Sequence, residues 1–246
     1  MQPYYQDEHC TIYHGDCAEI LPQLGKVDAV VTDPPYGIGK GNIISGRDIK
    51  KGKYDDFDWD TEPPSKELFQ KILELSTYQI IFGGNYFELP IMRGWLVWYK
   101  KQAARFSECE LIWTNLDITA KTFTYHWAGA VQETTGASKE NRVHPTQKPI
   151  KVMEWCLEHL PIKTGLILDP FMGSGTTLIA ARNAGFKSIG IDQDERYCKF
   201  AKERLTGELG LTLGQQKAID EKAAGQMNLL DLIDNASAIQ ARSDQK

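Results

Sequence analysis

The first residues with an evident chemical use stand where a strand is expected to end. Residues 30–39 read VVTDPPYGIG, in which a β-branched run is followed by Asp33, Pro34, Pro35 and Tyr36. Because proline fixes φ, the Asp33 carboxylate and the Pro34 carbonyl would be two hydrogen-bond acceptors held in place. An aspartate before two prolines also suits an ordinary strand-ending turn, and for this tripeptide alone the turn is the preferred interpretation.

A second segment combines a strand end with closely spaced glycines. Residues 166–185, LILDPFMGSGTTLIAARNAG, predict a strand that ends at Asp169 and a helix that begins near Thr176. Gly173 and Gly175 between them allow a close approach of the backbone to a ligand, and the free amides at a helix start favour negative or polar groups. The third glycine of GxGxxG is missing, and no lysine follows as in a Walker loop. A purely structural glycine turn is the alternative.

An acidic residue follows at the distance that a nucleotide site needs. Asp192, in IGIDQDERY, comes about 20 residues after the glycine turn, where the next strand is expected to end. Its carboxylate is placed to accept hydrogen bonds from a ribose. The glycine turn and this aspartate together predict a site for an adenosine-containing cofactor, without saying which one.

The elements that must position these residues alternate along the chain. Strands are predicted near residues 10–14, 27–32, 78–83, 95–99, 109–114, 166–169 and 188–192. Helices are predicted near residues 65–76, 149–160, 175–185 and 194–205. Strands separated by helices indicate an α/β fold with a doubly wound, mostly parallel sheet.

The two motifs together resemble those of the DNA amino-methyltransferases, which use S-adenosylmethionine. DPPY at 33–36 precedes DPFMGSGTT at 169–177 with a variable region between them, an order that resembles the β group of that family. HPTQKP at 144–149 and HGDCAEILPQL at 14–24 are also similar to that group, and the resemblance covers roughly residues 8–205. It implies a Rossmann-like methyltransferase sheet with the catalytic half first and the cofactor half last.

The resemblance implies methyl transfer to an exocyclic amine of a base in double-stranded DNA. The lone pair of such an amine is delocalised into the ring. Asp33 and the Pro34 carbonyl would each accept one N–H, which turns the lone pair toward the methyl donor. Pro35 would help to hold that carbonyl, and Tyr36 would stack on the base. A base in a duplex must be flipped out to reach such a pocket.

The resemblance also assigns cofactor-binding residues from several parts of the chain. Asp192 is expected to bind the ribose hydroxyls, although this acid is often glutamate in the family, so its reach is slightly shorter here. Asp16 and the Cys17 amide are expected at the adenine edge, and Thr146 and Lys148 near the methionine end. The pocket floor and the helix start beside it comprise Asp169, Phe171, Gly173, Ser174, Gly175, Thr176 and Thr177.

Adenine N6 is the expected target, because the cytosine-N4 enzymes usually carry serine where Asp33 stands; cytosine N4 stays open as an alternative. Methylation of cytosine carbon 5 needs a cysteine nucleophile, typically after a proline, and none of the five cysteines is so placed.

RNA and protein methyltransferases usually carry the related motif after the glycine-rich one, so the order of the motifs in this chain argues for DNA as the substrate. A non-enzymatic DNA-binding module with a relic pocket is the remaining alternative, and the intact motifs argue against it.

Two stretches with little periodicity lie between the motifs, at 37–63 and 115–147. Long irregular stretches in a compact domain are usually functional or disordered, and we expect 37–63 and 115–143 to contact DNA. The net charge is -5, but a local basic stripe is compatible with gripping phosphates. The residues expected to bind DNA are Lys40, Arg47, Lys50, Lys51, Lys53, Tyr125 and Trp127.

Composition predicts a cytoplasmic protein with one catalytic domain, at 1–205, and a partly helical or flexible appendage at 206–246. No apolar run is long enough to span a bilayer, and the first residues lack the apolar region of a signal peptide. The five cysteines are scattered without a CxxC pair, so neither a disulfide framework nor a metal site is expected. A homodimer is compatible with the sequence.

Overall fold

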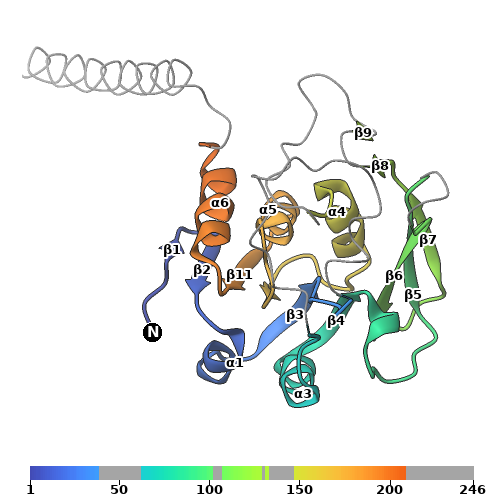
Figure 1. Cartoon of the computed structure of the whole chain (residues 1–246), viewed down its shortest axis with the longest axis horizontal. Helices are drawn as coiled ribbons and strands as arrows, with labels where there is room; N and C mark the ends of the chain where they lie inside the picture. The colour runs from blue at the N-terminus through green and yellow to red at the C-terminus, as the bar shows by residue number, and fades with distance from the viewer. Residues whose placement is uncertain (39–61, 102–106, 129–130, 133–146, 209–246) are drawn as a thin grey trace, which may run out of the picture. The chain divides into compact units, whose positions relative to one another are not determined.

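The computed structural model describes residues 1–38, 62–101, 107–128, 131–132 and 147–208 (Figure 1). The chain divides into two units, Met1–Leu205 and Thr206–Lys246. The second unit lies almost entirely outside the described residues, so the appendage at 206–246 stays a prediction.

In the described part of the first unit, nine strands form one sheet (Figure 1). Their order across the sheet is β1 (Tyr5–Gln6), β2 (Cys10–His14), β11 (Lys187–Asp192), β10 (Leu166–Asp169), β3 (Val27–Thr32), β4 (Ser76–Phe82), β6 (Cys109–Thr114), β5 (Trp95–Tyr99) and β7 (Lys121–Thr124). The pairs β1–β2, β4–β6 and β6–β5 are antiparallel, and the other neighbouring pairs are parallel. The α/β fold with a mostly parallel sheet is therefore confirmed. The short strands β8 (Trp127–Ala128) and β9 (Val131–Gln132) pair separately.

The described helices connect these strands. They are α1 (Cys17–Ile20), α3 (Lys66–Leu75), α4 (Ile150–Glu158), α5 (Thr176–Asn183) and α6 (Glu195–Thr206), with the 3₁₀ turns η1 (Leu21–Gln23) and η2 (Gly84–Tyr86). Ser65 begins α3 because its side chain accepts a hydrogen bond from the Leu68 amide, which has no partner within the helix. None of the helices in these stretches combines the length and the apolar character that crossing a membrane needs.

Alternation along the central strand explains why helices cover both faces of the sheet. In β3, Val30 packs in one cluster with Ile72 of α3. Its neighbours Ala29 and Val31 pack in another cluster with Met153 of α4. Successive side chains of a strand point to opposite faces, so α3 and α4 lie on opposite sides of the sheet.

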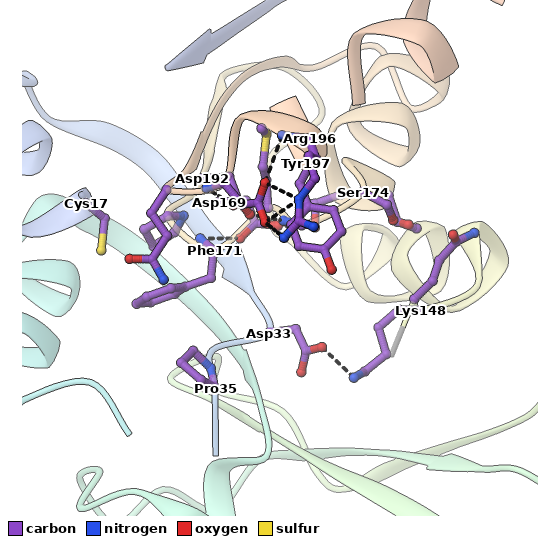
Figure 2. A pocket seen from close by; sticks show the side chains of 18 of the residues that line it. Cys17, Asp33, Pro35, Lys148, Asp169, Phe171, Ser174, Asp192, Arg196 and Tyr197 are labelled. Atoms are coloured by element: carbon purple, nitrogen blue, oxygen red, sulfur yellow. Dashed lines mark hydrogen bonds and ion pairs between the residues drawn. The ribbon is translucent and has the colours of Figure 1, made fainter. Parts of the chain in front are cut away.

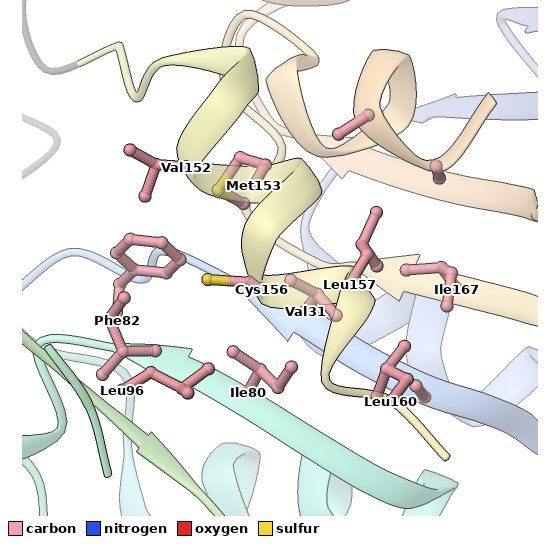
Figure 3. Close-up of a cluster of buried hydrophobic side chains, with 14 of the residues drawn as sticks. Val31, Ile80, Phe82, Leu96, Val152, Met153, Cys156, Leu157, Leu160 and Ile167 are labelled. Atoms are coloured by element: carbon pink, nitrogen blue, oxygen red, sulfur yellow. The ribbon is translucent and has the colours of Figure 1, made fainter. Parts of the chain in front are cut away.

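The larger buried cluster lies between α4 and the sheet (Figure 3). Met153, Cys156 and Leu157 of α4 pack in it with Val31 of β3 and Ile80 of β4, and none of the five is more than 1% exposed. Burial of an apolar side chain of this size stabilises the fold by roughly 1.5–3 kcal/mol. This packing fixes α4 on the sheet, and with it the residues that precede the helix.

The stretch predicted to be an irregular loop from residue 115 onward contains a strand. β7 pairs in parallel with β5, with Leu96 beside Lys121 and Tyr99 beside Thr124. Four residues are too few for a clear alternation, and the strand forms because β5 offers it an open edge. The other predicted strands and helices agree with the structure to within two residues at each end.

Candidate functional site

Three aspartates meet at one edge of the sheet because they follow neighbouring parallel strands. Asp33 comes directly after β3, while Asp169 ends β10 and Asp192 ends β11. β10 pairs in parallel with both β3 and β11, so the three carboxyl ends lie together. Ligands of open α/β sheets bind outside these ends. A cavity of about 520 Å³ opens there (Figure 2).

Most of the predicted site residues that the structure describes line this cavity. They are Cys17, Asp33, Pro35, Lys148, Asp169, Phe171, Gly173, Ser174, Thr176, Thr177 and Asp192. Asp16, Pro34, Tyr36 and Gly175 adjoin lining residues in the chain but are not in its wall. Thr146 lies outside the described residues.

Asp169 links the end of β3, where Asp33 follows, to the glycine turn before α5. It is only 2% exposed, and its carboxylate accepts hydrogen bonds from Thr32 Oγ1 at 2.6 Å, Thr177 Oγ1 at 2.5 Å and the Phe171 amide at 3.1 Å. Burial raises the pKa of Asp169 to about 6, against the lowering effect of these bonds. The carboxylate therefore ties β3 to the start of α5, next to the position of Asp33.

Asp192 lies beside the glycine turn, as a ribose-binding acid would. Its carboxylate accepts hydrogen bonds from the Gly173 amide at 3.0 Å and from the Asp194 amide at 2.8 Å. Burial raises its pKa to about 7, because the desolvation of the charge outweighs the two amide donors. Each carboxylate oxygen has a second lone pair, so Asp192 keeps capacity to accept hydroxyl groups of a ligand.

The two glycines of the turn differ in role. Both have positive φ, 49° at Gly173 and 75° at Gly175, in the region that favours glycine. A Cβ on Gly175 would lie 2.7 Å from the Cβ of Ala201, so this glycine allows α5 to pack closely on α6. Gly175 is not in the cavity wall, so its approach to a ligand stays a prediction. Gly173 is the one in the cavity wall.

Cys17 and Asp16 lie at the start of α1. The Asp16 carboxylate accepts a hydrogen bond from the Ala18 amide at 2.8 Å and caps the helix. Burial raises the pKa of the Cys17 thiol to about 12, so the thiol stays protonated and is no nucleophile.

α6 contributes residues that sequence reasoning missed. Arg204 Nη1 donates to the Ser174 carbonyl at 2.7 Å, and to Ser174 Oγ and Thr176 Oγ1 at 3.0 Å each. It thereby holds the turn from a helix about 30 residues away in sequence. Arg196 and Tyr197 line the cavity itself. Their position in the first turn after Asp192 is the signal that would have found them, because a helix start faces this edge of the sheet.

The catalytic candidate Asp33 is held by two donors. Tyr36 Oη donates to Asp33 Oδ1 at 2.5 Å. Lys148 Nζ donates to Asp33 Oδ2, also at 2.5 Å, and Figure 2 shows this second contact. The expectation that Lys148 approaches the methionine end of a cofactor stays a prediction, and its side chain lines the cavity. Its ammonium pairs with the Asp33 carboxylate, because the segment before α4 lies over the end of β3.

A second carboxylate, Glu110 of β6, completes this group and was also missed. Glu110 Oε2 lies 3.4 Å from Lys148 Nζ, and Oε1 lies 2.5 Å from Lys100 Nζ. The signal in the sequence is an acidic residue inside the otherwise apolar strand CELIWT. Charged residues are rarely buried unless they are paired.

The charges of this group perturb one another. Burial raises the pKa of Asp33 and the nearby Glu110 adds to the rise, while Lys148 opposes it. Burial also acts to raise the pKa of Glu110, but the ammonium groups of Lys148 and Lys100 outweigh it and leave that pKa lowered. For Lys148, burial acts to lower the pKa, and the two carboxylates raise it above its ordinary value.

Tyr36 is positioned by an aromatic contact and a glycine. Its ring stacks on that of Tyr86, with centroids 4.8 Å apart and planes 14° from parallel. Gly83 has φ 64°, and a Cβ there would lie 2.3 Å from the Tyr36 ring. Burial raises the pKa of Tyr36 well above its usual range, so its hydroxyl is a donor to Asp33. Stacking of Tyr36 on a base stays a prediction.

The aromatic residues expected to contact DNA lie in the core. Tyr125 and Trp127 are each 6% exposed and belong to the cluster under α4. The Tyr125 carbonyl accepts a hydrogen bond from Trp98 Nε1 at 2.9 Å, which ties the segment to β5. The prediction that these two rings stack on or wedge into DNA is therefore wrong for the structure described. The basic candidates lie outside the described residues; they are Lys40, Arg47, Lys50, Lys51 and Lys53.

Within the described ranges, no group of three His, Cys, Asp or Glu side chains is arranged to hold a metal ion. The polar groups at the cavity include aspartates, hydroxyl groups, backbone amides, one lysine and one arginine. Such a set suits an organic ligand with hydroxyl and amine groups.

Comparison with known proteins gives sequence matches over most of the chain. Residues 95–203 match the N6_N4_Mtase family model, described as DNA methylase. The Type II methyltransferase M2.LlaDCHI of Lactococcus lactis subsp. cremoris is 27% identical over 252 residues, which cover 83% of this chain and 92% of that protein. M2.DpnII of Streptococcus pneumoniae, also a Type II methyltransferase, is 26% identical over 254 residues, covering 84% and 93%.

Two solved structures share the fold. The cytosine-N4-specific PvuII DNA methyltransferase has a TM-score of 0.57 at 17% identity, with 89% of this chain and 93% of that chain covered. The M1.HpyAVI–SAM complex has a TM-score of 0.51 at 22% identity, with 80% and 98% covered.

Proposed function

Because the chain belongs to the N6-adenine and N4-cytosine DNA methyltransferases of the β group, we propose that it methylates adenine N6 in double-stranded DNA. The methyl donor is S-adenosylmethionine. The observation that carries the choice of adenine is Asp33, a carboxylate in the cavity wall where cytosine-N4 enzymes usually have serine. Restriction–modification is the setting that the Type II relatives indicate.

The cavity fits the cofactor in size and in chemistry. Its volume of about 520 Å³ lies in the range typical of small-molecule sites. We propose that Asp192 holds the ribose hydroxyls, that the Cys17 amide meets the adenine, and that Phe171 and Gly173 line the methionine side. When bound, S-adenosylmethionine supplies an electrophilic methyl group on a positively charged sulfur.

The residues after β3 prepare the target amine for attack. We propose that Asp33 accepts one N–H of the amine and the Pro34 carbonyl the other. These two acceptors draw the nitrogen toward tetrahedral geometry, so its lone pair is no longer delocalised into the ring and can attack the methyl group. As positive charge develops on the nitrogen, the nearby carboxylate stabilises it. The hydrogen bond from Tyr36 Oη to Asp33 Oδ1 supports this role, because it fixes the orientation of the carboxylate.

The target must leave the duplex to reach these acceptors. Asp33 lies in the wall of a cavity at the sheet edge, and a stacked and paired base cannot enter it. We therefore propose base flipping, with contacts to the phosphates from residues 37–63 and 115–143. The basic residues of the first stretch support this assignment by their charge.

The product nucleoside tests the proposal directly. DNA from cells that express this chain, digested and analysed by mass spectrometry, should contain N6-methyladenine. N4-methylcytosine in its place would contradict the choice of base while leaving the enzyme class intact. Unmodified DNA from cells with the folded protein would contradict the function.

Asp33→Asn tests the role of the carboxylate. The amide keeps the shape of the side chain but lacks its negative charge. The activation free energy should therefore rise by about 2.7–4 kcal/mol, which lowers turnover roughly 100- to 1,000-fold. Affinity for S-adenosylmethionine, measured by calorimetry, should stay near that of the wild type. Glu88→Gln is the matched control, because Glu88 forms an exposed ion pair with Lys66. Turnover of Asp33→Asn at the control rate would exclude the mechanism.

A further inference from the structure

Both oxygens of the Asp33 carboxylate are engaged before any base is present. Tyr36 Oη donates to Oδ1 and Lys148 Nζ donates to Oδ2, each at 2.5 Å. Figure 2 shows the Asp33 and Lys148 side chains pointing toward each other. The proposed reaction needs an Asp33 oxygen for the target amine, and a cation at this distance competes with the amine for it.

The Lys148 ammonium also lies against the aromatic rings at the end of β3 and β4. Nζ is 5.7 Å from the centroid of the Tyr36 ring and 5.4 Å from that of Phe82, both within the range of cation–π attraction. A base that stacks on Tyr36 while its amine reaches Asp33 would lie against the same tyrosine ring and the same carboxylate. Lys148 Nζ therefore lies beside Asp33 in the position that the target amine would take, and it carries the positive charge that the amine acquires only during the reaction.

A second acceptor for the ammonium stands beside the first. Glu110 Oε2 is buried and lies 3.4 Å from Lys148 Nζ, and among the described residues it accepts no hydrogen bond. The other oxygen of Glu110 is paired with Lys100 at 2.5 Å, which keeps Glu110 in position. The lysine side chain is long and flexible, so a small rotation brings Nζ from one carboxylate to the other.

We propose that Lys148 holds the place of the target amine in the DNA-free enzyme and that Glu110 receives its ammonium when the base enters. This inference rests on the proposed function, because it concerns the same carboxylate. Two effects favour the transfer. A buried Asp33 without a counter-ion is costly, so Lys148 compensates it until the base arrives. An ammonium left on Asp33 would then repel the positive charge that develops on the amine.

Glu110 is thus a positioning residue, and its effect should depend on Lys148. In Glu110→Gln the ammonium loses its second carboxylate and stays on Asp33. We expect kcat on unmethylated genomic DNA with labelled S-adenosylmethionine to fall about 10- to 100-fold. KM for DNA should change little, because the contacts to the duplex are untouched.

Lys148→Met removes the competitor. It should keep kcat within about tenfold of the wild type, and Glu110→Gln added to it should lower kcat by less than about threefold further. A purely structural role of Glu110 would give the same loss in both backgrounds. That result, or a loss in Lys148→Met as large as in Asp33→Asn, would overturn the inference.

Controls separate this inference from the proposed function. Every variant is checked for cofactor affinity and thermal unfolding, and Lys148→Gln replaces Lys148→Met if the latter does not fold. The exposed pair Lys66 and Glu88 serves for a matched cycle, in which neither substitution should change kcat. Absence of methylation by the wild type contradicts the proposed function itself. Methylation with additive losses contradicts only the place-holding role of Lys148.

Discussion

Asp192 is a carboxylate of the cavity wall whose charge should change near neutral pH. Burial raises its pKa to about 7. Ribose hydroxyls donate to the ionised form, so ligand binding favours loss of the proton. We therefore expect the affinity for S-adenosylmethionine to weaken as pH falls, approaching about tenfold for each unit below 7, and to level off above it. Calorimetry between pH 5.5 and 8.5 measures this profile.

The control for that profile is Asp192→Asn, which has no charge to lose. Its binding should be weaker at high pH and nearly independent of pH. A profile of unchanged steepness in this variant would show that another group titrates. Asp169 is the first alternative, since burial raises its pKa to about 6, but its carboxylate is already satisfied by three internal donors.

At the scale of elements, the connection between β4 and η2 shapes the catalytic end of the site. Gly83→Ala places a Cβ in a left-handed backbone and against the Tyr36 ring. We expect the free energy of unfolding to fall by about 1–2 kcal/mol from the backbone alone. Turnover should fall as well, because the displaced Tyr36 no longer holds Asp33. Denaturant unfolding and kcat measure the two effects.

Gly25→Ala is the matched control for this change. Gly25 has no positive φ, and a Cβ there meets no atom within 4 Å. It should leave both turnover and stability nearly unchanged. If Gly83→Ala behaved like Gly25→Ala in kcat, the contact between this turn and Tyr36 would have no part in catalysis.

At the scale of the whole molecule, DNA binding should depend on positively charged side chains in the stretches between the motifs. Lys50, Lys51 and Lys53 are expected to contact phosphates. Replacing all three by glutamine should weaken DNA binding and reduce the slope of log K against log salt by about 0.9 for each lost contact. Fluorescence anisotropy with labelled duplex DNA at several salt concentrations measures this slope.

A second triple variant shows whether the effect is local. Lys26, Lys163 and Lys187 are exposed and lie near the amino ends of β3, β10 and β11, at the edge away from the cavity. Their replacement by glutamine changes the net charge equally and should leave the salt slope close to that of the wild type. Equal slopes for the two triple variants would place the DNA contacts elsewhere.

The sequence by itself determined where the candidate site residues stand in their elements. Asp33, Asp169 and Asp192 were all predicted at strand ends, and the structure brings them to one edge. This succeeded because strand and helix periodicity, turn glycines and prolines act over a few residues. The order of the motifs along the chain likewise indicates the β group of the DNA amino-methyltransferases, because that order belongs to the sequence alone.

The partners of those residues came only from the packing of distant segments. Lys148 meets Asp33 across 115 positions of sequence, and Glu110 joins them from a third element. Tyr125 and Trp127 are buried because α4 packs over them, which their polar surroundings in sequence do not reveal. The partners of a side chain depend on which helices and strands lie beside it. That arrangement is determined by burial of the whole hydrophobic core and not by the local conformational preference of each segment.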